Sequence, residues 1–382
     1  MIISPQKIIT GDGKSVLVDT AIHIDDTGTI TDLASARILK EKYPDDLEIC
    51  YPNSTVLPGV ADIHIHIGFW EDPVPEKLRN PMSLAMHCAS RMNRALKRGI
   101  TLVRDMASPE LAVQSLNTAA EFGWFDLPRM IGCGAGLCIT GGHCYFYSPD
   151  VLEVDGKEEL VKEIRRHFRD GYRWTKLMTT DRTQLAEFTL EEMTAAAQET
   201  HRLGGKITVH AGNRAGIQTC IDANVDGVEH GVGMTEQQAQ AMIEKGMYWT
   251  PTIHILRQTY LDYKAQNHVR DDSYTYFETA TQFFEEKFLK YYKMGVPVAA
   301  GTDLDDFPVI DELEEMVRLG LSPLEAIKVG CHNGACAVGL GDITGLVAAG
   351  YSADFMVVDG DVEKDVSLMK RPKAVYFKGK QV

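Results

Sequence analysis

The chain has 382 residues, of which 44% are hydrophobic and 24% charged, and its formal net charge is −15. This length suits one large domain with a smaller appended unit, because single hydrophobic cores stop growing at about 250–300 residues, and the composition is typical of globular rather than disordered proteins. The acidic balance, without any block of Lys and Arg, argues against a nucleic-acid partner, since a polyanion would be repelled on average.

The N-terminal segment MIISPQKIITGDGKS has neither the basic region nor the apolar region of a secretory signal. No apolar run approaches the ~20 residues that a membrane-spanning helix needs. The eight cysteines show no CxxC pair, which agrees with a reducing compartment. We therefore expect a cytoplasmic protein that does not bind membranes.

Both ends of the chain contain short β-like segments broken by Gly, Asp and Pro. They are SVLVDTAIHID and LEICYPNSTVLPG near the N-terminus, and ADFMVVDGD and KAVYFKGKQV near the C-terminus. We expect residues 1–57 and 347–382 to pair into one small β unit.

Between these ends, residues 58–346 alternate apolar strand patterns with amphipathic helix patterns, which is typical of a parallel sheet built from βα units. Eight strand candidates can be counted: VADIHIHIG, TLVRDM, RMIGCGAG, RWTKLMTT, KITVHAG, GVEHG, MYWTPTIHI and VPVAAGTD. Eight parallel strands close a TIM barrel, so the sequence predicts an α/β protein with a (β/α)8 barrel.

Several helices carry start and stop signals. Ser108 and Pro109, with Gly123 further on, predict an N-cap, a first helical residue and a terminal glycine around ELAVQSLNTAAEF. Thr189 with Glu192, and Ser322 with Glu325, are predicted capping boxes. These signals support helices between the strand candidates.

The first strand candidate contains a His-x-His pair. On a regular strand His64 and His66 would project to one face, into the barrel, while Ile63, Ile65 and Ile67 would pack on the helices. Two imidazoles at the end of a barrel strand suit a divalent metal ion. By itself the pair is equally compatible with two hydrogen-bonded core histidines.

Further ligand types end later strands. His210 closes KITVH, His230 closes GVEH and Asp303 closes VPVAAGTD. Barrel active sites lie at this carboxyl end of the strands. Lys176, inside RWTKLM, shares the inward-facing parity of Trp174 and Met178. An inward lysine is costly to desolvate unless it is paired, metal-linked or modified, and the alternative is a lysine that reaches solvent.

Long stretches of the chain resemble the amidohydrolase superfamily, in particular its prolidase-like branch of Xaa-Pro and Xaa-Arg dipeptidase type. The stretches are VLPGVADIHIHIG, KITVHAGNRAGIQTCIDANVDGVEHG, AAGTD and GLSPLEAIKVGCHNGACAVGLGDITGLVAAGYSADFMVVDGD. The resemblance covers nearly the whole chain, with the motifs in the same order. It implies a barrel with a β-sandwich formed by the two chain ends.

The resemblance also implies a dinuclear metal site. Its first ion would be held by His64, His66 and Asp303 and its second by His210 and His230, with Lys176, carboxylated by carbon dioxide, bridging both. Zinc is the expected metal, because the ligands are rich in imidazole. The implied reaction is hydrolysis of an amide by a metal-bridging hydroxide, with Asp303 as general base and then general acid.

Substrate residues follow from the same resemblance. His143 takes the place of the histidine of the TGGH loop, which contacts a substrate carboxylate, although Cys144 follows it here instead of the frequent glycine. Tyr248 in MYWTPT resembles another substrate-side position. We expect a small-molecule substrate, a dipeptide or an N-acyl amino acid, and the sequence leaves a homo-oligomer open.

Two other functions remain open at this stage. A cyclic-amide hydrolase or deaminase, similar to imidazolonepropionase, would use the same scaffold, often with one metal ion and no strand lysine; the presence of Lys176 argues against that version. A non-catalytic binding barrel would be expected to lack a ligand or the catalytic Asp. All six implied ligand positions are filled.

Overall fold

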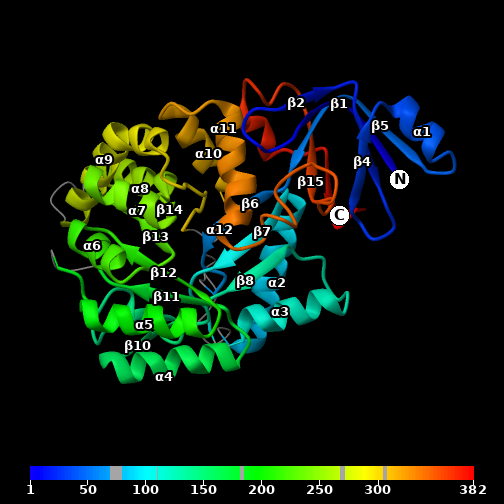
Figure 1. Ribbon diagram of the computed structural model, residues 1–382. Coiled ribbons are helices and arrows are strands. Elements are labelled where there is room, and N and C mark those ends of the chain that lie inside the picture. Colours follow the sequence, from blue (N-terminus) through cyan, green and yellow to red (C-terminus); the bar gives the residue numbers. More distant parts are fainter. Residues whose placement is uncertain (69–79, 110, 181–184, 267–271, 304–307) are drawn as a thin grey trace.

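The computed structural model describes residues 1–68, 80–109, 111–180, 185–266, 272–303 and 308–382. A β-rich unit contains both chain termini, and the alternating strands and helices form the larger part of the molecule (Figure 1). In the described part of the chain, no helix is long and apolar enough to cross a membrane.

The two ends of the chain share one sheet, in the order β17-β16-β15-β5-β1-β3-β4, with β2 paired to β1. Strand β5 pairs in parallel with β1 and antiparallel with β15, which confirms that the ends pair. The elements are β1 (Ile2–Ile9), β2 (Val16–Val18), β3 (Ala21–Ile24), β4 (Ile30–Ala34), α1 (Ala36–Lys42), β5 (Glu48–Pro58), β15 (Phe355–Asp359), η4 (Val366–Lys370), β16 (Ala374–Phe377) and β17 (Lys380–Gln381).

The middle of the chain forms two parallel sheets, in the orders β6-β7-β8 and β10-β9-β11-β12-β13-β14. The strands are β6 (Val60–Ile65), β7 (Ile100–Asp105), β8 (Arg129–Gly132), β9 (Gly136–Cys138), β10 (Val151–Glu153), β11 (Trp174–Met178), β12 (Lys206–Ala211), β13 (Gly227–His230) and β14 (Tyr248–Thr250). Seven of the eight strand candidates therefore contain strands.

The eighth candidate, VPVAAGTD, joins the two sheets on one side. Val298 forms a parallel bridge with Trp249 of β14, and the carbonyl of Ala300 accepts a hydrogen bond from the backbone N–H of Ile63 in β6 (3.1 Å). The segment thus lies between β14 and β6. It brings the residues that follow it to the carboxyl end of β6.

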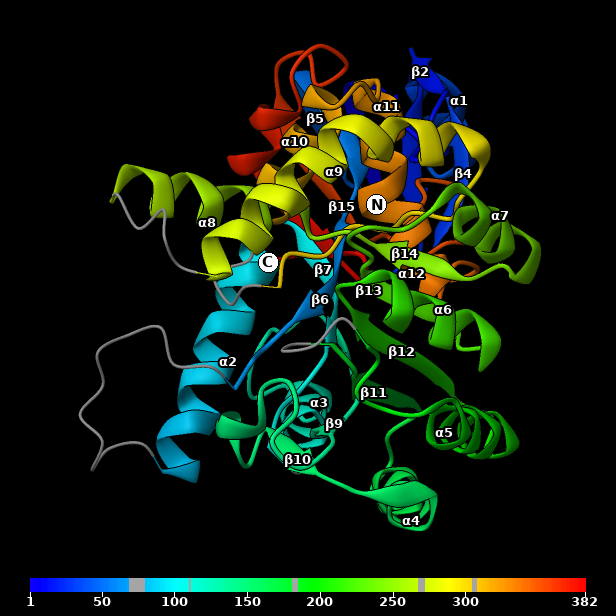
Figure 2. The ribbon, with the colours of Figure 1, turned by 90° about the vertical axis from the view of Figure 1, so that its left-hand side faces the viewer.

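Helices cover the outer face of the parallel strands; Figure 2 shows α4 to α7 outside β11, β12 and β13. They are α2 (Pro81–Lys97), α3 (Ala112–Glu121), α4 (Gly156–Arg169), α5 (Leu190–Arg202), α6 (Arg214–Asp222), α7 (Glu236–Lys245), α8 (Ile253–Ala265), α9 (Asp272–Met294), α10 (Val309–Arg318), α11 (Pro323–Lys328), the π-helical turn η3 (Val329–Asn333) and α12 (Gly334–Ala337). The glycine-rich segment after β8 holds β9, the 3-10 turn η2 (Tyr145–Tyr147) and β10, and is not a plain loop.

The capping signals are confirmed at two helices and wrong at one end of a third. Thr189 and Ser322 form complete capping boxes at α5 and α11. Gly123, with φ +70°, directly follows the C-cap of α3. Ser108 is not the N-cap of this helix, because its backbone N–H bonds to the carbonyl of Gly134 (3.2 Å) and continues the pairing beyond β7. The helix begins only after Leu111.

Candidate active site

Strand β6 carries an irregularity that places its histidines. The β6–β7 register shifts between Asp62 and Ile65, and such an irregularity breaks the alternation of side chains. Ile63 packs in the cluster that contains Trp174 and Ala335 of α12, and its side chain lies close to Gly334 of the same helix, whereas Ile65 belongs to the main cluster, which contains residues of other helices. Ile63 thus packs on a helix, as predicted. His64 faces the interior, where Nδ1 of its ring lies 2.7 Å from Oε2 of Glu229 in β13.

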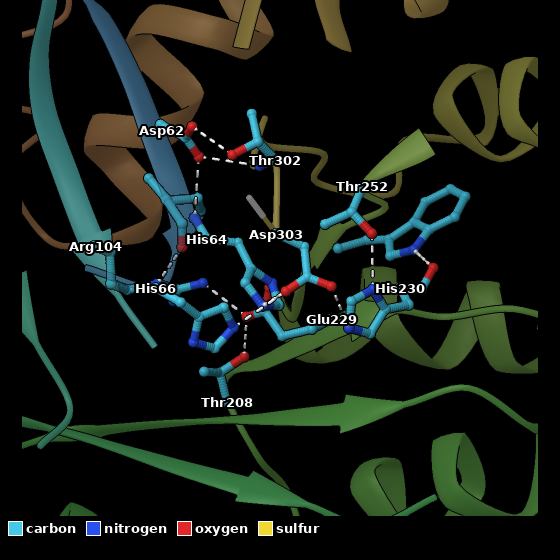
Figure 3. Close-up of polar contacts among 12 residues, drawn as sticks. Asp62, His64, His66, Arg104, Thr208, Glu229, His230, Thr252, Thr302 and Asp303 are labelled. Carbon is cyan, nitrogen blue, oxygen red and sulfur yellow. Dashed lines mark hydrogen bonds and ion pairs between the residues drawn. The ribbon is translucent and has the colours of Figure 1, made fainter. Parts of the chain in front are cut away.

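His64, His66 and Asp303 converge at the end of β6 (Figure 3). The Nε2 atoms of His64 and His66 lie 3.2 and 3.1 Å from Oδ1 of Asp303. One ligand atom from each of these residues falls within 4.8 Å of the others, so the three could hold a metal ion. Asp303 has φ +56°, and its backbone N–H donates to the carbonyl of His64 (2.7 Å). Positive φ at a non-glycine residue is typical of functional sites.

The two separate histidines lie beside this group. The rings of His210 and His230 are 4.5 Å apart, and the ring of His230 is 5.1 Å from that of His64. Nε2 of His230 is 4.0 Å from Oδ2 of Asp303. His230 has φ +65°, and this turn in the backbone lets it face the interior together with its neighbour Glu229, which a regular strand would not allow.

Lys176 is buried among these residues. Its side chain lies on β11 and is 1% exposed, and its amine has no hydrogen-bond partner among the described residues. The amine interacts electrostatically with all four histidines and with Asp303. Burial lowers the pKa of Lys176. A buried, unpaired amine is costly, so this position calls for a partner or a modification.

The charge states in the site suit metal ligation. Burial would raise the pKa of Asp303, but His64 and the hydrogen bonds from both histidines outweigh it and hold this pKa well below its usual range. Burial lowers the pKa of His230 to about 3 and that of His210 well below the usual value. At neutral pH the site therefore offers an ionised carboxylate from Asp303 and neutral imidazoles from His210 and His230, the forms that bind cations.

A buried carboxylate that sequence reasoning missed holds His64. Glu229 accepts hydrogen bonds from Nδ1 of His64 and from the guanidinium of Arg104, both at 2.7 Å, and from the hydroxyl of Thr208. Burial would raise the pKa of Glu229, but Arg104 and His64 hold it well below its usual range. An ionised carboxylate only accepts, so Nδ1 of His64 carries a proton, and Nε2, which faces Asp303, would be the atom that binds a cation after losing its own proton. The signal in the sequence was a glutamate inside the short strand GVEH.

The other members of the site have partners that sequence reasoning also missed. Nδ1 of His230 lies 2.7 Å from the hydroxyl of Thr252, and Nε2 of His210 lies 3.0 Å from the carbonyl of Thr180. Asp62 accepts hydrogen bonds from the backbone N–H (3.1 Å) and hydroxyl (2.8 Å) of Thr302, next to Asp303. Single Thr residues give no distinctive sequence signal.

Of the two expected substrate residues, the structure brings one to this site. His143 stacks on His210 with ring centroids 3.9 Å apart, and its backbone N–H donates to Glu187 (3.0 Å). Tyr248 begins β14, pairs with Gly227 and packs against the interior cluster of Trp174. Tyr248 lies at the amino end of its strand, whereas the candidate ligands lie at the carboxyl ends of theirs. The structure therefore does not place Tyr248 with the candidate ligands.

Comparison with known proteins decides the family. A model described as "Amidohydrolase family" matches residues 55–382. The chain belongs to the amidohydrolase family. This amidohydrolase is similar to ochratoxinase from Aspergillus niger, with 27% identity over 409 residues that cover 96% of this chain and 83% of that protein.

Solved structures of similar proteins agree. The crystal structure of A. niger ochratoxinase matches with a TM-score of 0.88 and 25% identity, over 100% of this chain and 94% of the other. That of a Xaa-Pro dipeptidase with bound methionine in the active site matches with a TM-score of 0.90 and 26% identity, over 100% and 99% of the two chains. This amidohydrolase is therefore a prolidase-like member of the superfamily and a metal-dependent hydrolase that acts on amide bonds.

Proposed function

We propose that this amidohydrolase binds two divalent cations, zinc by preference, and hydrolyses the amide bond of a dipeptide or an N-acyl amino acid. The observation that carries the proposal is the buried Lys176 amine, which lies among five ligand-type side chains without a hydrogen-bond partner in the described part of the chain. We further propose that the parallel strands close into the (β/α)8 barrel of residues 58–346, with a β-sandwich formed by residues 1–57 and 347–382.

The donor set fits two ions. His64, His66 and Asp303 would hold the first, since their donor atoms already converge. His210 and His230 would hold the second. Nε2 of His210 faces the Thr180 carbonyl, so Nδ1 would be its ligand atom, whereas Nδ1 of His230 faces Thr252, so Nε2 would be its ligand atom.

A carboxylated Lys176 would complete the set. Its uncharged amine would attack carbon dioxide, forming an N–C bond and releasing a proton, and the resulting carbamate oxygens would bridge both ions. The reaction converts a neutral amine into an anion that bound cations would pair with, whereas an ammonium at this position would be a buried cation without a partner.

The protein's own groups then have separate roles in hydrolysis. Bound divalent ions would supply polarisation of the scissile carbonyl and a lowered pKa for water. The ionised carboxylate of Asp303 accepts a proton from the attacking water and returns it to the leaving nitrogen as the C–N bond breaks. His64, fixed by Glu229, and His230, fixed by Thr252, hold their positions through this transfer.

Zinc content and Lys176 variants test the dinuclear site. The purified protein, supplied with zinc, should approach two ions per chain. Lys176→Ala should retain about one or fewer and lose about a hundredfold or more in kcat/KM, with partial rescue by short carboxylic acids. Lys206→Met is the control, because Lys206 begins β12, the strand beside β11, and its amine donates to the carbonyl of Ala337 in α12 (3.2 Å). Saturation of the unmodified protein at one ion, or full turnover in Lys176→Ala, would contradict the proposal.

Substrates with and without a terminal carboxylate test the substrate class. His143 lies against His210, so its imidazole would bind a substrate carboxylate by a charge-assisted hydrogen bond. Loss of such a partner costs about 1–3 kcal/mol, so amidation of the substrate's C-terminus should lower kcat/KM by roughly ten- to a hundredfold. His143→Ala should reduce hydrolysis of the free acid much more than that of the amide. Equal hydrolysis of both substrates would favour a cyclic-amide hydrolase instead.

A further inference from the structure

Glu312 is a fully buried acid on helix α10 that has no part in the chemistry described above. Its side chain is 0% exposed, and its two carboxylate oxygens accept hydrogen bonds from the backbone N–H groups of Ile253 (2.9 Å) and His254 (2.6 Å). These are the first two residues of α8. Glu312 therefore caps another helix across a tertiary contact, where the free N–H groups and the helix dipole favour a carboxylate.

Helix α8 needs this cap because its own N-cap side chain is used elsewhere. Thr252, the N-cap residue, has φ +50° and makes no side-chain hydrogen bond to the helix. Its hydroxyl instead lies 2.7 Å from Nδ1 of His230 (Figure 3). A threonine N-cap ordinarily accepts a hydrogen bond from the second or third helical N–H. Glu312 supplies acceptors for the first N–H groups of α8, which the side chain of Thr252 does not bind.

The backbone of His230 is held separately from its ring. The indole N–H of Trp249 donates to the carbonyl of His230 (2.8 Å). Nδ1 of the ring lies 2.7 Å from the hydroxyl of Thr252. The hydrogen bond to the Thr252 hydroxyl therefore helps to set the direction of the His230 ring, which also packs against His64 and His210.

We propose that Glu312 is a positioning residue for the second ligand pair: by holding the start of α8, it keeps the Thr252 hydroxyl on Nδ1 of His230, so that Nε2 of His230 faces Asp303. The proposal rests on the proposed function, in which His230 binds the second cation. It predicts that a residue outside the metal site controls the geometry of one ligand.

A role in joining α10 to α8 does not by itself explain why Glu312 is a buried acid. The same two helices are already linked by Arg257 and Glu315, 3.1 Å apart. Burial raises the pKa of Glu312, while the hydrogen bonds from the N–H groups of His254 and Ile253 favour its ionised form and lower it. Apolar packing would connect the helices without desolvating a carboxyl group. What a carboxyl group offers here is two acceptors for two adjacent N–H groups, and the amide of Gln offers only one.

A double-mutant cycle tests the proposal. Glu312→Gln removes one acceptor, and Thr252→Ala removes the hydroxyl while Thr252→Ser keeps it. Glu315→Gln is the matched control, because it weakens the α8–α10 contact away from Thr252. We expect Glu312→Gln and Thr252→Ala each to lower the affinity for the second zinc ion about tenfold or more, measured by chelator competition. The double variant should be little worse than either single variant, and Glu315→Gln and Thr252→Ser should bind zinc as the unmodified protein does.

A second measurement needs no metal. In histidine-labelled, metal-free protein, the 15N signals of the His230 ring, assigned by their loss in His230→Asn, should shift in Glu312→Gln and Thr252→Ala but not in Glu315→Gln. Unchanged His230 signals in Glu312→Gln, or the same change in Glu315→Gln, would overturn the proposal. An unmodified protein that binds one zinc ion would contradict the dinuclear site, and the 15N signals would then still decide the role of Glu312.

Discussion

A single buried carboxylate, Glu229, connects Arg104, His64 and the hydroxyl of Thr208 among the parallel strands. Arg104 donates to the carbonyl of Ile63 (2.7 Å) as well as to Glu229, and its guanidinium lies over the ring of Trp174. Each polar atom in this group thus has a partner, which makes its burial tolerable. The consequence is a fixed ring orientation for His64.

Replacing Glu229 by Gln should weaken zinc binding by about 10- to 100-fold, because the amide no longer holds the proton on Nδ1 of His64. It should also destabilise the protein by about 3–5 kcal/mol, since Arg104 loses a buried counter-charge. Chelator competition and urea unfolding measure the two effects. Thr208→Val, which removes one hydrogen bond but keeps the carboxylate, should cost only about 1 kcal/mol. Zinc affinity unchanged in Glu229→Gln would show that Glu229 is only structural.

At the scale of single elements, the helices that follow ligand-bearing strands start with strong local signals. Helix α5 comes after β11 with Lys176, and α7 comes after β13 with His230; both begin with complete capping boxes. The box at α7, formed by Thr235 and Gln238, was missed in the sequence. A helix that starts at a defined residue fixes the length of the connection from the strand, and thereby the residues left to form the site.

Removal of the α5 cap should lower stability without changing the chemistry. The hydroxyl of Thr189 accepts from the N–H of Glu192 (3.2 Å), and Glu192 bonds back to the N–H of Thr189 (2.9 Å). Thr189→Ala should therefore lower the free energy of unfolding by about 1 kcal/mol, measured in urea, with zinc content unchanged. Thr189→Ser, which keeps the hydroxyl, is the control. A cost equal in both variants would mean that the methyl group, and not the cap, matters.

At the scale of the whole molecule, Asp354 joins the terminal sheet to the parallel strands. This residue is 1% exposed and accepts hydrogen bonds from Arg129 of β8, from Thr344 and from the backbone of Lys378. Its own carbonyl accepts from Gly59, between β5 and β6. One carboxylate thus satisfies donors from both parts of the protein.

Asp354→Ala should destabilise the protein by about 3–5 kcal/mol, because it leaves these donors and the Arg129 charge without a buried acceptor. Equilibrium unfolding followed by two probes would also show whether the two parts still unfold together. Asp359 provides the control: it lies at the end of β15, is exposed, and pairs with Lys373 (3.0 Å), so Asp359→Ala should cost about 1 kcal/mol or less. Similar losses in the two variants would contradict a special role for Asp354.

The sequence by itself determined the features that depend on neighbouring residues. Alternating apolar patterns located seven strands, and Ser, Thr and Glu at fixed spacing located the starts of α5 and α11, because each of these signals lies within a few residues. Short motifs in a fixed order along the chain indicated the family. The same locality explains why the strand ends could be named as the place of His64, His210, His230 and Asp303 before any contact among them was known.

Only the tertiary structure decided how those side chains are held. The partner of His64 is 165 residues away in the chain, Arg104 is 125 residues from Glu229, and Glu312 is 59 residues from the helix that it caps. No short-range pattern records such pairs. The irregular register of β6 beside His64 and the place of Tyr248 at the amino end of β14 depend on strand pairing and on position along the strand. These are properties of the assembled sheet, because cross-strand pairing sets which face and which end of the sheet a side chain occupies.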